Sequence, residues 1–286
     1  MLLGCYDIAK KTSVRDNAVP PVLLLSVLTG AFIWLSILAL GFLHDRSYST
    51  LFYLDVRQHL LLLAKAAMVG TSWSCAFFAL KYLPLSVATP IRATSPLWTI
   101  LLAVAVMNER PAAIQWAGIA LVLAAFFALS RVGAKEGIYF HRDRGVTLMI
   151  VATLLGSLCA LFDKYLLQVV KISPMAVQAW FSIYLVPVML PLAIRWFNRE
   201  RVETPFQRRW SIPMIAILLL IADYVYFRAV AEPDALISVI SPLRRTSVII
   251  PFAFGLIRLK EKNWSIKTPC IVLILLGVYL LSIGSN

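Results

Sequence analysis

The chain has 286 residues, of which 60% are hydrophobic and 14% charged, and its formal net charge is +13. Soluble domains carry nearer a quarter charged residues, so this composition excludes an ordinary soluble protein and predicts an all-α membrane protein with several transmembrane helices. In a membrane chain, basic residues mark cytoplasmic connections, and we therefore expect no nucleic-acid partner.

Ten apolar segments approach or exceed the length of helix, about 20 residues, that crosses a bilayer. In chain order they cover residues 1–10, 19–43, 59–81, 84–107, 112–130, 146–168, 174–195, 211–230, 235–257 and 265–284. Most connections between them are short, so we expect neighbouring helices to pack antiparallel. The polar stretch 131–145 is one of two longer connections and is the predicted boundary between two halves.

An internal repeat supports that boundary. The segment "LSVATPIRATS" (85–95) recurs as "ISVISPLRRTS" (237–247), and Glu109 matches Glu261 at the same offset of 152. Each half, 1–131 and 145–286, is then a unit of five helices. Because five is odd, the second unit enters the membrane with the opposite orientation, which predicts two inverted repeats, the architecture of many secondary transporters.

The first predicted helix is short in comparison with its counterpart in the second half. Asp7 aligns with Asp163, and at that alignment Met1 faces Ser157, well inside the sixth helix. We expect either a half-helix at this position or a misassigned start that omits roughly eleven residues of an inverted repeat.

The distribution of charge predicts an orientation. Connections that follow odd-numbered helices hold 17 Lys and Arg residues, and connections that follow even-numbered helices hold 4. The bias places the odd connections in the cytoplasm and the C-terminus outside.

Charged residues inside the predicted spans are candidates for function, because each costs about 2.5–3.5 kcal/mol on insertion scales at the centre of a lone helix. Arg92 and Arg244 are equivalent in the repeat, whereas Arg245 aligns with Ala93. Two interpretations stay open for these arginines. They form an anion-binding site, since guanidinium donates paired hydrogen bonds to carboxylate or phosphate, or they form salt bridges with Asp223, Asp163 or Asp7.

The remaining candidates are polar or aromatic residues of the same helices. For Asp223 we consider proton coupling or cation contact, or else pairing with Arg228 or Arg245, and for Lys65 we expect the amine to reach the membrane surface. The predicted substrate-binding residues are Arg92, Arg244, Arg245, Trp73, Tyr224, Ser95 and Ser247, and the predicted coupling or charge-pair residues are Asp7, Asp163 and Asp223. The cysteines and histidines lack metal-ligand spacing, so no metal and no cofactor are expected.

Two stretches resemble the drug/metabolite transporter superfamily, specifically its ten-helix members with two EamA-like domains. They are residues 77–129 and 227–284, each with an aromatic-Ala stretch, a Pro-containing helix, a glutamate and a final Gly-bearing apolar helix. The usual Gly before that glutamate is Asn108 in the first half and Lys260 in the second. The resemblance implies a carrier of the inner (plasma) membrane with a central cavity, alternating access without ATP, and both termini in the cytosol, which opposes the charge count.

We therefore predict a secondary transporter of a small organic metabolite, with the arginines favouring an anionic one. The alternatives are a flippase for lipids or lipid-linked intermediates and a non-transporting membrane scaffold. No enzyme is expected, because the sequence has no catalytic triad and no nucleotide-binding glycine loop. The expected partners are the small-molecule substrate and membrane lipids, and a homodimer is an open alternative.

Overall fold

The computed structural model describes residues 2–44, 53–107, 112–135, 137–232, 240, 244, 246–259 and 264–283. Within these ranges every regular element is helical. The α-helices are α1 (Leu2–Val14), α2 (Val19–His44), α3 (Val56–Tyr82), α4 (Leu85–Ala93), α5 (Ser95–Met107), α6 (Ala113–Lys135), α7 (Arg144–Lys164), α8 (Pro174–Arg195), α9 (Ser211–Ala231), α11 (Ile249–Ile257) and α12 (Trp264–Ile283). Single π-helical turns, Tyr165–Val169 and Trp196–Glu200, extend α7 and α8.

Six of the described helices are long and apolar enough to cross a membrane: α2, α3, α6, α7 with its π-helical turn, α8 with its own, and α9. A bilayer core offers no water to backbone N–H and C=O groups, so a spanning segment has to satisfy them internally, as a helix does. The prediction of an all-helical membrane protein with several spans is confirmed.

Polar residues cap the starts of α3, α7 and α8. At the start of α3, Asp55 Oδ1 accepts from the backbone N–H of Gln58 at 2.6 Å, and Gln58 Oε1 accepts from the backbone N–H of Asp55 at 3.0 Å. This reciprocal pair is a capping box, which satisfies donors that the first turn leaves free. Asp143 and Ser173 cap α7 and α8 through one such bond each.

The segment 84–107 differs from the prediction of one continuous helix. The structure divides it into α4 and α5, which meet at Thr94. Pro96 explains the division, because it has no N–H to donate to the carbonyl of Arg92 and its ring crowds that carbonyl. In the segment predicted at 235–257, residues 235–239, 241–243 and 245 lie outside the described residues, and α11 covers its final turns.

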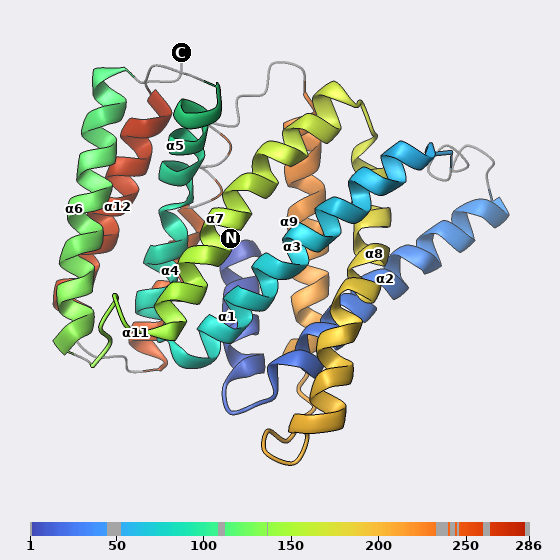
Figure 1. Cartoon of the computed structure of the whole chain (residues 1–286), viewed down its shortest axis with the longest axis horizontal. Coiled ribbons are helices and arrows are strands. Elements are labelled where there is room, and N and C mark those ends of the chain that lie inside the picture. The colour runs from blue at the N-terminus through green and yellow to red at the C-terminus, as the bar shows by residue number, and fades with distance from the viewer. Residues whose placement is uncertain are drawn as a thin grey trace.

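Figure 1 shows α6 beside α12 at one end of the molecule and α2 beside α8 at the other, with α1 and α4 between them. The long helices α3 and α7 also pack together, as do α1 and α9. Helix α1 starts at mid-height in the bundle and reaches only one face, whereas α12 ends at the opposite face (Figure 1).

The contact of α6 with α12 depends on two glycines. A Cβ atom at Gly118 would lie 2.8 Å from the carbonyl oxygen of Gly277, and one at Gly277 would lie 2.6 Å from Cγ2 of Val122. Small residues at such contacts let helix backbones approach closely, which is the main source of helix association in a membrane.

We expect Gly118→Ala to lower the free energy of unfolding by about 1–3 kcal/mol, because the added methyl group overpacks this contact. Thermal unfolding of the purified protein in detergent measures the effect. Gly30→Ala is the matched control, since a Cβ there meets only the Cβ of Ala216, at 4.0 Å. Equal melting temperatures for the two variants would contradict the prediction, because they would show that the close contact of α6 with α12 adds nothing to the stability of the protein.

Candidate functional site

A cavity lies at the centre of the bundle, bounded by α1, α3, α4, α7, α8, α9 and the segment around Arg244. Its volume open to the centres of water molecules is about 130 Å³. This exceeds many times the volume that one water molecule needs, about 10–15 Å³, so the space can hold a small organic molecule. Helices α1, α3 and α9 each contribute several residues at helical spacing. They are Leu3, Tyr6, Asp7 and Lys10 from α1; Lys65, Val69, Ser72, Trp73 and Ala76 from α3; and Leu219, Asp223, Tyr226 and Phe227 from α9.

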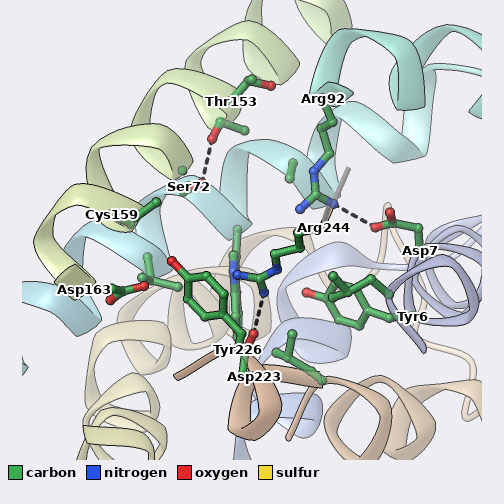
Figure 2. Close-up of a pocket in the computed structure, with 18 of the residues that line it drawn as sticks. Tyr6, Asp7, Ser72, Arg92, Thr153, Cys159, Asp163, Asp223, Tyr226 and Arg244 are labelled. Atoms are coloured by element: carbon green, nitrogen blue, oxygen red, sulfur yellow. Dashed lines mark hydrogen bonds and ion pairs between the residues drawn. The ribbon is translucent and has the colours of Figure 1, made fainter. Parts of the chain in front are cut away.

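One side of the cavity carries a carboxylate that two cations share. Asp7 Oδ1 lies 2.6 Å from Lys10 Nζ and 2.7 Å from an Nη atom of Arg92 (Figure 2). Lys10 is 1% exposed, and its ammonium group lies 4.2 Å from the centroid of the Tyr6 ring, where a cation–π contact adds to the ion pair. A single oxygen therefore serves both cations.

A second arginine–aspartate pair also lines the cavity. An Nη atom of Arg244 lies 2.5 Å from Asp223 Oδ1, and the guanidinium carbon lies 4.1 Å from the ring centroid of Tyr226. Figure 2 shows the guanidinium groups of Arg244 and Arg92 in the same cavity. The side chain of Arg244 keeps 25% of its surface exposed, so it can contact a molecule that enters.

A third pair is more deeply buried. Lys65 Nζ donates to Asp163 Oδ1, and the two side chains are only 2% and 9% exposed. The same ammonium group lies 4.9 Å from the Phe181 ring centroid and 4.5 Å from that of Phe227. The expectation that Lys65 reaches the membrane surface is wrong, because the face of α3 that carries Lys65 turns toward α7 and Asp163.

The structure gathers most of the predicted site residues around this cavity. Arg92, Arg244, Trp73, Ser247, Asp7, Asp163 and Asp223 all line it. The Ser247 hydroxyl donates to the backbone carbonyl of Arg244 at 2.9 Å, which holds the segment that carries the arginine.

Three predicted residues lie elsewhere or are not described. Ser95 is buried against α7, with its hydroxyl 2.8 Å from that of Ser157, and does not line the cavity. Tyr224 is 37% exposed on the outer face of α9, whereas Tyr226 lines the cavity. Residues two positions apart on a helix point about 200° apart, so only one of these tyrosines can face inward. Arg245 lies outside the described residues.

The sequence-based prediction missed Lys10, Lys65, Tyr6 and Phe181, which also line the cavity. For the first three, helical spacing was the available indication. Tyr6 and Lys10 flank Asp7 within one turn of α1, and Lys65 lies two turns before Ser72 on α3. Phe181 could not be found in this way, because it is itself apolar and lies among other aromatic residues of α8.

The fold and the cavity define a helical protein with several transmembrane segments and a charged internal chamber. Residues 2–131 match the model of the EamA-like transporter family. A crystal structure of another protein aligns with 98% of this chain and 92% of its own, with a TM-score of 0.64 and 18% sequence identity, which shows a shared fold. No curated protein matches the sequence.

The resemblance to the drug/metabolite transporter superfamily is therefore confirmed, and residues 2–131 are similar to the EamA-like transporters. This similarity indicates a membrane transporter of small molecules.

Proposed function

We propose that the chain is a secondary transporter of a small organic metabolite that carries an anionic group, and that it works by alternating access through the central cavity in the plasma membrane. The observation that carries the proposal is the charge of the cavity wall. Among its described lining residues are four bases, Lys10, Lys65, Arg92 and Arg244, and three acids, Asp7, Asp163 and Asp223. The described lining therefore carries one more base than acid, inside an apolar bundle.

Two of these bases meet at Asp7, where one oxygen contacts both Lys10 and Arg92. If Arg92 turns toward a substrate, Asp7 still keeps Lys10 as its counter-ion. The guanidinium group of Arg92 can then donate paired hydrogen bonds to a carboxylate or phosphate without leaving a buried charge uncompensated.

Alternating access follows from the proposed architecture of two inverted five-helix repeats, residues 1–131 and 145–286. In that arrangement α1, α2, α3 and α6 correspond to α7, α8, α9 and α12. The helix contacts support it, since exchanging the halves turns the contact of α3 with α7 into that of α9 with α1, and the contact of α3 with α8 into that of α9 with α2. The pairs α6–α12 and α2–α8 map onto themselves. Two similar halves around one site can rock between outward-open and inward-open states.

The proposal is tested by thermal unfolding of the purified protein against a library of metabolites. A ligand at 100 times its Kd raises the free energy of unfolding by about 2.7 kcal/mol, so carboxylated or phosphorylated members of the library are expected to raise the melting temperature. Uptake into proteoliposomes then checks that each ligand is transported. If only uncharged or cationic compounds stabilise the protein, and Arg92→Gln binds them as before, the assignment of an anionic substrate is wrong.

A further inference from the structure

A second, smaller cavity adjoins the central one between α2, α8 and α9. The two share a wall made of Trp73, Phe181, Leu219 and Asp223. We call this smaller space the side pocket. Most of the side chains that line it are apolar, and its volume open to the centres of water molecules is about 30 Å³. By the volume that one water needs, about 10–15 Å³, it admits a small group such as an amine on a short alkyl chain.

The side pocket contains a buried oxygen that has no partner among the residues the structure describes. Gln178 lines the pocket and is 1% exposed. Its Nε2 donates to the backbone carbonyl of Leu220 at 2.6 Å, while its Oε1 is buried and accepts no hydrogen bond. The orientation of the amide follows from the chemistry, because only the nitrogen can donate to a carbonyl. A buried acceptor of this kind normally has a partner, so it points to a ligand that supplies a donor.

Two serines of the side pocket also have side-chain oxygens that can accept a hydrogen bond. The Ser26 hydroxyl donates to the carbonyl of Leu23 at 2.8 Å, and the Ser182 hydroxyl donates to the carbonyl of Gln178 at 2.7 Å. Each hydroxyl hydrogen is thus used within its own helix, and each oxygen keeps lone pairs that can accept. Together with Gln178 Oε1 and the Asp223 carboxylate, these oxygens are the acceptors in an otherwise apolar lining.

The position of Asp223 connects the side pocket to the anion site. Asp223 is 7% exposed and is paired with Arg244. An anionic substrate that draws Arg244 away leaves this carboxylate without its cation, which is unfavourable in a buried site. A substrate that also brings a protonated amine replaces the lost partner. Trp73 and Phe181 in the shared wall are aromatic, and an aromatic ring can contact a cation.

From these contacts we infer that the substrate is dipolar, with an anionic group on the arginines of the central cavity and an amine that enters the side pocket beside Asp223 and Gln178. The inference rests on the proposed transport function. It adds to the anion site a second site, which binds the amine of the substrate. Upon binding, the Arg244–Asp223 pair is exchanged for two new pairs, one with each end of the substrate.

The test compares two series of compounds of matched length: butyrate, valerate and caproate against γ-aminobutyrate, δ-aminovalerate and ε-aminocaproate. Binding to the purified full-length protein is measured by calorimetry. In the wild-type protein at least one amino compound is expected to bind about tenfold or more tightly than its alkanoate, the effect of one well-placed charge-assisted hydrogen bond. Gln178→Leu is expected to reduce that preference to less than about twofold, because the acceptor is gone.

Gln168→Leu is the matched control. The side-chain amide of Gln168 also donates to backbone carbonyls, those of Val230 at 2.9 Å and Glu232 at 3.1 Å, at the C-terminal end of α9. Gln168 lines neither cavity. It should keep the full preference for the amine. Gly30→Val supplies a second variant that needs no loss of a hydrogen bond, since its side chain would fill the side pocket and should weaken only the amino series.

The possible failures are distinguishable. Equal binding of both series by the wild-type protein, or a preference that survives in Gln178→Leu and Gly30→Val, would overturn the side pocket as an amine site, while alkanoate binding that depends on Arg92 would leave the proposed anion transport standing. Absence of binding in both series would count against both proposals if, in addition, Arg92→Gln leaves the binding of every metabolite found by thermal unfolding unchanged.

Discussion

Arg244→Ala is expected to reduce transport by more than about tenfold, because it removes a charge-assisted contact to the anionic end of the substrate. The same change leaves Asp223 without its cation and should also lower the free energy of unfolding by about 1–3 kcal/mol. Transport into proteoliposomes and thermal unfolding in detergent measure the two effects separately.

The double variant Arg244→Ala/Asp223→Asn separates a binding role from a structural one. Removing the orphaned carboxylate is expected to restore the melting temperature toward that of the wild-type protein while transport stays low. Recovery of transport together with stability would mean that the pair only holds α9 against the segment around Arg244. Normal transport by the single variant would remove Arg244 from the binding site altogether.

Lys65→Met is expected to cause the largest loss of stability in the cavity wall, about 3–5 kcal/mol, because it leaves the carboxylate of Asp163 buried without a counter-ion. The two side chains are 2% and 9% exposed, so water cannot replace the missing partner. Thermal unfolding and the yield of monodisperse protein in detergent are the measurements. Methionine keeps an unbranched side chain of similar length against Phe181 and Phe227.

The double variant Lys65→Met/Asp163→Asn should recover most of that loss, since a buried ion pair contributes little net stability compared with a neutral pair of similar volume. A single variant as stable as the wild-type protein would contradict the ion pair. If the double variant is stable but inactive, the pair serves the transport cycle and not merely the packing of α3 against α7.

The side pocket changes the view of the substrate that the arginines alone suggested. Arg92 and Arg244 favour an anion. Asp223, however, is paired with the guanidinium group of Arg244 and also lines the side pocket together with Gln178. An account based only on positive charge would leave that carboxylate unpaired in the bound state. A dipolar substrate satisfies both ends of the Arg244–Asp223 pair.

Much of the fold of this protein could be predicted from its sequence alone, because the membrane spans depend on residues that are neighbours in the sequence. A run of about 20 apolar residues has few stable solutions in a bilayer other than a helix, so the spans follow from the order of residues. The cost of a charge at membrane depth likewise identifies Asp7, Arg92, Asp163, Asp223 and Arg244 as residues that face the interior. Each of these inferences depends on neighbouring residues, which the sequence contains.

The pairing of those charges depended on the tertiary structure. Lys65 meets Asp163 across 98 positions of the chain, and Arg92 meets Asp7 across 85. Nothing local selects these partners, since each base had several acids of equal chemistry available. Rotation of the helices decided the choice, as it also turned Tyr226 inward and Tyr224 outward and buried Ser95 against Ser157. The sequence by itself determined which residues had to leave the lipid, and helix packing determined what each of them meets.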